Sequence, residues 1–264
     1  MTSKLVLVTG ASSGIGEATA MRYGAGGAHV LLLARNAERL ERVADSIRRA
    51  GGSATPYAID LADANAIAET STRIKREHGT PDIVINNAGA GRWLPLVDTT
   101  AEDALAMIAV PYLAAFNLTR AFVPDMIARG SGALAYITSP ASYLAWPNAS
   151  AYIAARRGVA GLADTLQVEL RGTGLAVTLV VLGPVETPYW KHNPGSRERL
   201  PAANPMFAPT LSSEQAAEAI CAGVAARKRT VVKPGIFRAL FVLNAIAPRL
   251  VARQLRRSIP KQST

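Results

Sequence analysis

The chain has 264 residues, 49% of them hydrophobic and 18% charged, which suffices for the core of one large domain and excludes a disordered protein. A single cysteine, Cys221, excludes an internal disulfide framework and fits a reducing compartment. The net charge of +10 belongs to the end of the chain, because ten basic residues and no acidic residue follow Glu218.

Seven runs rich in Val, Ile and Leu alternate with helical patterns. The expected strands are 4–9, 29–33, 54–59, 82–86, 133–138, 175–181 and 230–233. The expected helices are 14–24, 37–50, 63–78, 101–129, 150–171 and 212–227. Continuous apolar strands between helices are typical of a sheet that is buried on both faces. The sequence therefore predicts an α/β fold, a single Rossmann-type doubly wound domain over residues 1–234, with a mostly parallel seven-stranded sheet and helices on both faces.

The first expected strand runs into a turn that carries three glycines and opens a helix. Glycines let the backbone approach a pyrophosphate, and the N–H groups at a helix N-terminus attract its negative charge. We therefore expect a dinucleotide site, with an ordinary strand-to-helix turn without a ligand as the alternative. The expected contacts are Gly10, Ser12, Ser13, Gly14, Ile15 and Gly16.

The end of the second expected strand bears on the type of dinucleotide. An NAD site places an acidic residue there, which holds the ribose 2′-hydroxyl. This chain has Ala34, followed by Arg35 and Asn36. A guanidinium without an acidic neighbour suits a 2′-phosphate. The sequence therefore predicts NADP(H), with Ser12 and Ser13 as further donors; a solvated surface role for Arg35 is the alternative.

Three later motifs carry chemistry. Asn86-Asn87-Ala88-Gly89 closes the fourth expected strand, Ser139 closes the fifth, and Tyr152 follows at the start of a helix. With the spacing of the glycine turn, they resemble the short-chain dehydrogenase/reductase (SDR) family over residues 4 to about 233. The resemblance implies that Tyr152 protonates a carbonyl oxygen as hydride arrives from the nicotinamide, and that Ser139 hydrogen-bonds the same oxygen.

The resemblance also implies the rest of the cofactor site, without a metal. It places Asp60 and Leu61 at the adenine. The remaining implied contacts are Asn87, Ala88, Gly89, Tyr152, Arg156, Gly183, Val185 and Thr187.

Two positions depart from the family pattern. The family has a lysine four residues after the tyrosine, where this chain has Arg156. Arginine keeps the positive charge beside Tyr152, but its planar fork is longer and cannot give up a proton. The family's catalytic asparagine falls on Pro111, which has no amide and frees the carbonyl of Met107 in mid-helix. Both departures lie at positions that, in the family, relay protons between the catalytic tyrosine and bulk water.

Aromatic residues flank the expected active site. Trp93 follows the asparagine motif, Trp146 follows Ser139, and Tyr189 lies in the long Pro-rich stretch 184–212, which we expect to be a substrate loop or lid. The sequence therefore predicts an oxidoreductase that transfers a hydride between NADP(H) and a small apolar alcohol or ketone. The alternative is an NADP(H)-binding protein of the same fold with little or no turnover, acting as a sensor or assembly partner.

Within the expected helix 101–129, the segment 104–127 is apolar nearly all round. A helix without a polar face is buried on both sides, so we expect it to contact a partner subunit in a homo-dimer or homo-tetramer. Cover by the chain's own loops is the alternative.

Residues 235–264 form a basic amphipathic extension. From 236 to 257, apolar residues recur at helical spacing with a break near Pro248, accompanied by five arginines and no acid. This segment is too short to span a bilayer, but it can cap the substrate site, pack on a second subunit or lie in an anionic membrane interface. We expect a cytoplasmic protein, and the sequence leaves these three roles of the C-terminal segment open, contact with an anionic membrane included. A nucleic-acid partner is not expected, because the segment has no recognisable binding motif.

Overall fold

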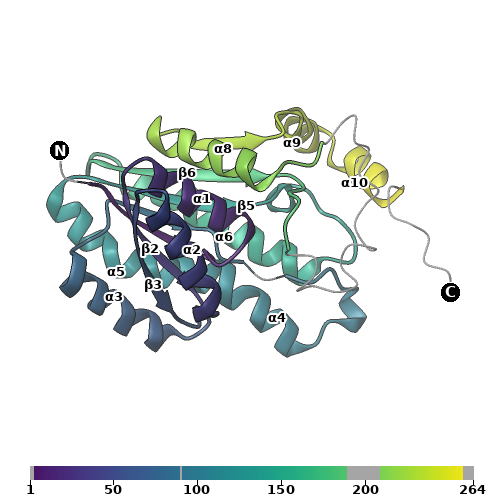
Figure 1. Ribbon diagram of the computed structural model, residues 1–264. Helices are drawn as coiled ribbons and strands as arrows, with labels where there is room; N and C mark the ends of the chain where they lie inside the picture. The colour runs from purple at the N-terminus through teal and green to yellow at the C-terminus, as the bar shows by residue number, and fades with distance from the viewer. Residues whose placement is uncertain (1–2, 90, 189–208, 258–264) are drawn as a thin grey trace.

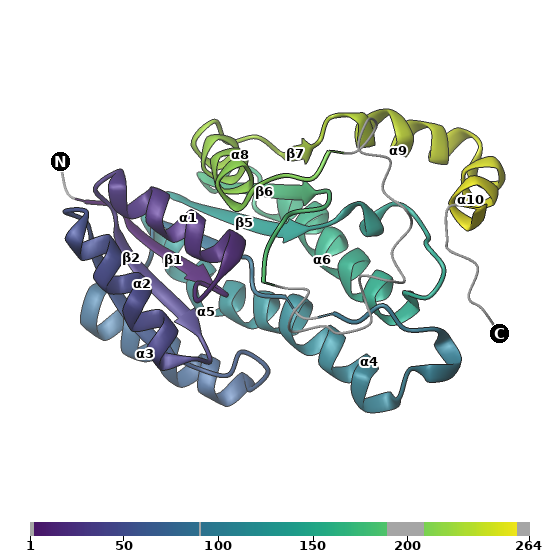
Figure 2. The same ribbon diagram turned by 45° about the vertical axis from the view of Figure 1, so that its right-hand side comes forward.

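The computed structural model describes residues 3–89, 91–188 and 209–257. Its strands form one sheet in the order β3-β2-β1-β4-β5-β6-β7, and every neighbouring pair is parallel (Figures 1 and 2). The sheet is thus wholly parallel, where the sequence predicted a mostly parallel one. The strands are β1 Leu5–Thr9, β2 His29–Ala34, β3 Ser53–Ala58, β4 Ile83–Asn86, β5 Gly132–Thr138, β6 Leu175–Leu182 and β7 Thr230–Lys233.

Helices cover both faces of the sheet, as predicted (Figure 1). In β1, Leu7 belongs to the core of one layer, while Val6 and Val8 belong to the core of the other. Because both faces are buried, the strands are continuously apolar. One layer contains α1 Gly14–Ala25, α2 Ala37–Arg49 and α8 Ser213–Ala225, and the other contains α3 Ala64–His78, α5 Ala114–Arg129 and α6 Ser150–Glu169.

The strand order places β1 between β2 and β4. The chain runs outward from β1 to β3 and then crosses back to β4 on the other side. In open parallel sheets, ligands bind beyond the carboxyl ends of the strands at such a switch point. The glycine turn, Asn87 and Ser139 follow β1, β4 and β5, so the fold brings these motifs to one edge of the sheet.

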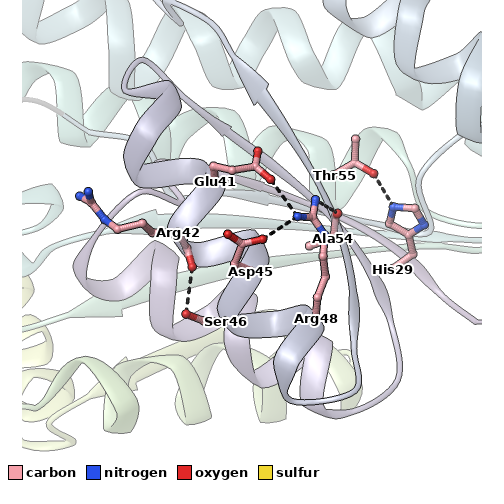
Figure 3. A network of polar contacts seen from close by, with 8 residues as sticks. All are labelled: His29, Glu41, Arg42, Asp45, Ser46, Arg48, Ala54 and Thr55. Carbon is pink, nitrogen blue, oxygen red and sulfur yellow. Dashed lines mark hydrogen bonds and ion pairs between the residues drawn. The ribbon is translucent and has the colours of Figure 1, made fainter.

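A polar network joins α2 to the edge strand β3 (Figure 3). Arg48 donates to Glu41 at 2.8 Å, to Asp45 at 2.9 Å and to the Ala54 carbonyl at 3.0 Å. These bonds fix the end of α2 against β3. In the neighbouring strand, the ring of His29 contacts the Thr55 hydroxyl at 2.8 Å.

The stretch expected as one helix, 101–129, consists of three segments. They are α4 Ala101–Ile108, a π-helical turn η2 Ala109–Leu113, and α5. Pro111 lies inside η2, and the N–H of Ala114 donates to the carbonyl of Ala109, five residues back. Proline has no N–H and collides with the preceding turn, so the helix widens at this point.

By length and composition alone, the whole stretch Ala101–Arg129 is apolar enough to cross a membrane. In the fold, however, α5 contributes Leu118 and Phe122 to the core, as an ordinary core helix does. Its other side remains exposed at Phe116 and Ile127, and α4 exposes Leu105. Within the described residues, no loop of the chain covers these side chains.

The described chain ends in two helices, α9 Ile236–Ile246 and α10 Pro248–Arg257. The break between them lies at Ala247, directly before Pro248, where the sequence predicted an interruption. Because α9 follows β7 directly, both helices lie beyond the carboxyl ends of the strands (Figure 2).

Candidate active site

Hydrogen bonds through Thr9 join the glycine turn to the segment after β4. The Thr9 hydroxyl accepts from the N–H groups of Asn87 and Ala88, each at 2.9 Å, and Asn87 Nδ2 donates to the Thr9 carbonyl at 2.9 Å. Gly10 has φ +66°, and a Cβ at this position would lie 3.0 Å from Ala88. At Gly16, a Cβ would collide with the Gly10 carbonyl. Both positions therefore require glycine.

The start of α1 fits a phosphate. Ser13 precedes the helix in an extended conformation, and in the described part of the chain its side chain makes no capping hydrogen bond. The first N–H groups of α1 therefore lack a side-chain partner, which is the arrangement that binds anions at helix N-termini. Ser12, Gly14 and Ile15 in the same turn are partly accessible.

The expected adenosine contacts fall into two groups. Arg35 is exposed directly after β2, and Asp60 is exposed after β3, where it accepts from the N–H of Ala62 at 3.0 Å. Asn36 and Leu61 serve the fold: the Asn36 side chain caps α2 by accepting from the Arg39 N–H at 2.8 Å, and the Leu61 side chain is buried in the core. Arg35 and Asp60 thus present the accessible charges at this end of the site.

The two expected catalytic hydroxyls are adjacent. Tyr152, in the first turn of α6, donates to Ser139 Oγ at 3.3 Å. Ser139 precedes a 3₁₀ turn, η3 Pro140–Ser142, and its hydroxyl also accepts from the Ala141 N–H at 3.1 Å. This bond fixes the side chain of Ser139 at the end of β5. Two hydroxyls at this distance can both reach one carbonyl oxygen.

Arg156 is buried, with 8% of its surface exposed, and lies against the ring of Tyr152. Its guanidinium carbon is 5.1 Å from the ring centroid, and Nη1 donates to the carbonyl of Ile137 at 3.3 Å. A Cβ at Gly89 would lie 2.6 Å from Nη2, so the guanidinium fills the space that glycine leaves open. Among the described residues, the buried Nε has no hydrogen-bond partner.

Two tryptophans near Tyr152 form an aromatic wall. The rings of Trp93 and Tyr152 are 5.9 Å apart, and those of Trp93 and Trp146 are 6.3 Å apart. Trp93 is buried in a small apolar cluster with Tyr152, Met107 of α4 and Ala141 of η3. Tyr189, the third expected substrate contact, lies outside the described residues.

The expected substrate loop is closed at its base. Val185 pairs with Leu211, and the N–H of Gly183 donates to the Lys233 carbonyl at 2.7 Å. A Cβ at Gly14 would lie 3.1 Å from Thr187, so Thr187 lies over the glycine turn. Gly183, Val185 and Thr187, three of the expected cofactor contacts, therefore lie where the loop joins the sheet edge, and residues 189–208 of the loop are outside the described part.

Two hydroxyls that the sequence gave no reason to single out hold α6 in place. The hydroxyls of Thr138 and Ser142 are 2.6 Å apart, so one donates to the other, and the carbonyl of Arg156 accepts within reach of both, at 3.2 Å and 2.8 Å. They connect the segment of Ser139 to the helix of Tyr152. Thr9, which joins the glycine turn to Asn87, was also not among the predicted site residues. The position of Thr9 beside the glycine turn could have identified it from the sequence, whereas nothing in the sequence marks Thr138 or Ser142.

Comparison with known proteins agrees with the geometry. Residues 4–197 match the family model described as short chain dehydrogenase, and the chain belongs to this family of oxidoreductases. The match ends before residue 233, to which the motifs extended the resemblance. The probable oxidoreductase EphD of Mycobacterium tuberculosis is 33% identical over 241 residues, which are 87% of this chain and 40% of that protein. The chain thus spans less than half the length of this curated relative.

Two solved structures are similar over most of the chain. A short-chain dehydrogenase from Sphingobium yanoikuyae in complex with NADPH is 25% identical with a TM-score of 0.80, covering 99% of this chain and 98% of its own. A metagenomic short-chain oxidoreductase in complex with NADP is 33% identical with a TM-score of 0.69, covering 83% of this chain and 89% of its own.

Proposed function

We propose that the chain is an NADP(H)-dependent oxidoreductase that interconverts an apolar alcohol and its ketone. The observation that carries the proposal is the pair of hydroxyls, Tyr152 and Ser139, 3.3 Å apart at the sheet edge that holds the glycine turn. When bound, NADP(H) supplies the hydride in reduction and accepts it in oxidation. Tyr152 donates a proton to the carbonyl oxygen in reduction and takes it back in oxidation, and Ser139 donates a hydrogen bond to that oxygen.

Arg156 acts on Tyr152 through charge. Its guanidinium carbon is 5.1 Å from the ring centroid, so a positive charge stays beside the tyrosine throughout the proton transfer. Among the residues described, Nε of Arg156 and the side-chain amide of Asn86 are buried without a hydrogen-bond partner. A bound dinucleotide or an ordered water would satisfy such groups. Both observations support a site that is completed by its cofactor.

The preference for NADP(H) rests on charge. Arg35 is exposed directly after β2, and this strand ends in Ala34 and not in the acidic residue that would oppose a 2′-phosphate. The two similar structures that hold NADPH or NADP support the same assignment.

The aromatic wall of Trp93 and Trp146 supports the substrate class. The ring of Trp93 packs 5.9 Å from the ring of Tyr152, and the partly accessible ring of Trp146 lies 6.3 Å from that of Trp93, so the surroundings of the tyrosine are apolar. An aromatic, steroid-like or long-chain ketone fits such a wall better than an ionised sugar or acid.

The assembly follows from the exposed apolar residues of α4 and α5. Leu105 is 65% and Phe116 43% exposed, and this apolar face fits a second copy of the chain in a homo-dimer or homo-tetramer. The enzyme would act in the cytoplasm.

The test is a turnover assay with NADPH and with NADH against a panel of aromatic and long-chain ketones. The parent protein is expected to reduce at least one ketone, and Tyr152→Phe to lower the rate by about 100-fold or more. Tyr57→Phe, the same change on β3, is the matched control and should keep the rate. If NADPH raised the melting temperature but no ketone were reduced, the sensor or assembly function would replace this proposal.

A further inference from the structure

The outward face of α9 is apolar. Val242 is 60% and Ile246 78% exposed, and Leu250 at the start of α10 is 61% exposed. A helix on the surface of a globular domain ordinarily turns a polar face to water. Only one charged side chain, Arg238, belongs to the exposed positions of α9, which are Ile236, Arg238, Ala239, Val242, Leu243, Ala245 and Ile246.

The inward face of the same helices is already anchored to the fold. Phe241 of α9 packs on the ring of Tyr143 with centroids 4.5 Å apart, and Asn244 Nδ2 donates to the Tyr143 carbonyl at 3.0 Å. Phe237 and Val251 are buried in the core. The outward side chains therefore cannot be buried by a rotation of α9 without loss of these contacts.

The same surface is strongly basic. Five exposed arginines accompany the apolar side chains, and in the described part of the chain none of them forms an ion pair: Arg238, Arg249, Arg253, Arg256 and Arg257. No acidic residue follows Glu218, so the charge is not compensated along the chain. In Figure 2, α10 projects from the body of the molecule beyond the sheet edge.

These features select one occupant. A second copy that paired through this face by a two-fold axis would set arginines against arginines, which is unfavourable. An anionic lipid surface is complementary in both respects, since phosphate headgroups attract arginine and the acyl region accepts aliphatic side chains. We propose that α9 and α10 dock the protein on an anionic membrane surface, with Ile246 and Leu250 entering the lipid and the arginines at the headgroups.

The test is sedimentation of the full chain with vesicles of phosphatidylcholine alone and of phosphatidylcholine mixed with phosphatidylglycerol. Binding is expected to the mixed vesicles and to fall as salt is added. Arg249→Glu with Arg253→Glu should lower the partition coefficient by about tenfold or more, and Ile246→Ser with Leu250→Ser by about tenfold. All four side chains are exposed, so these variants should keep the thermal stability of the parent.

The matched control is Arg49→Glu with Arg171→Glu, the same change of charge at the amino ends of β3 and β6, on the opposite edge of the sheet. This variant should keep binding. Equal sedimentation of the parent with both vesicle types, or equal loss in the control, would overturn the proposal. So would a smaller oligomer in light scattering of the Ile246→Ser, Leu250→Ser variant, because the face would then join copies of the chain. None of these readouts depends on turnover.

Discussion

Arg156 shows how one residue change alters its surroundings. In place of a flexible amine, the guanidinium lies against the ring of Tyr152, donates to the carbonyl of Ile137 and reaches the open Cα of Gly89. If the residue contributes only its charge, Arg156→Lys should keep or raise kcat. Arg156→Met removes the charge and should lower kcat by about 100-fold. Loss of activity in the lysine variant would contradict the charge-donor role and indicate a site fitted to the guanidinium.

Gly89 gives a second test at this position. A Cβ there would lie 2.6 Å from Nη2, so Gly89→Ala should displace the guanidinium and lower kcat by about tenfold, with the fold retained. In the Arg156→Lys background, no Nη2 is present for the alanine Cβ to displace, so Gly89→Ala should change kcat little. Steady-state kinetics of the two single variants and the double variant measure this coupling. An equal loss of kcat in both backgrounds would show that Gly89→Ala does not act through the guanidinium of Arg156.

We expect Arg35 to set the cofactor preference. Arg35→Ala should weaken NADPH binding by about 1–3 kcal/mol and change NADH binding little, because only NADPH carries the 2′-phosphate. Calorimetric titration of both cofactors gives the two affinities. A parent protein that bound the two cofactors equally would refute the assignment.

At the scale of elements, the ties through Thr138 and Ser142 connect β5 to α6. Removal of both hydroxyls by Thr138→Val with Ser142→Ala should lower the free energy of unfolding by about 1–3 kcal/mol. Urea denaturation measures the change. The control is Ser46→Ala on α2. The exposed hydroxyl of Ser46 donates to the carbonyl of Arg42 (Figure 3), and its removal should lower the free energy of unfolding by less than about 0.5 kcal/mol. Equal costs would show that the buried ties add nothing.

The sequence predicted elements better than contacts. The ends of each strand were predicted within about two residues. Apolar runs such as Leu5–Thr9 are too short for an ordinary helix and are bounded by turn residues, which favours a strand. The π turn was not predicted: Pro111 signalled an irregularity, but whether a helix kinks or widens depends on the neighbours that pack against it. Likewise, the bonds of Thr138 and Ser142 to Arg156 join residues that only the fold brings together.

For the whole molecule, stability should fall in mild acid. Burial first, and the neighbouring ring of His78 second, lower the pKa of His29 from 6.5. As the pH falls below about 6.5, the unfolded chain takes up this proton before the folded one does, so the free energy of unfolding decreases, by at most about 1.4 kcal/mol per pH unit. Above that pH the contribution is fully present. Urea denaturation between pH 7.5 and 5.5 should show this slope, and His29→Gln should flatten it; parallel profiles for parent and variant would assign the slope to other groups.

The whole fold gathers motifs from β1, β4, β5 and β6 around one pair of hydroxyls, and the central claim is that a hydride passes there. The direct measurement is reduction of an apolar ketone with NADPH deuterated at C4 of the nicotinamide, followed by mass spectrometry of the alcohol. With the deuterium on the face of C4 that is transferred, the account predicts one deuterium on the carbinol carbon of the alcohol made by the parent protein, and about 100-fold less alcohol with Tyr152→Phe in the same time. An alcohol without deuterium from either labelled face, or no alcohol despite bound NADPH, would contradict it.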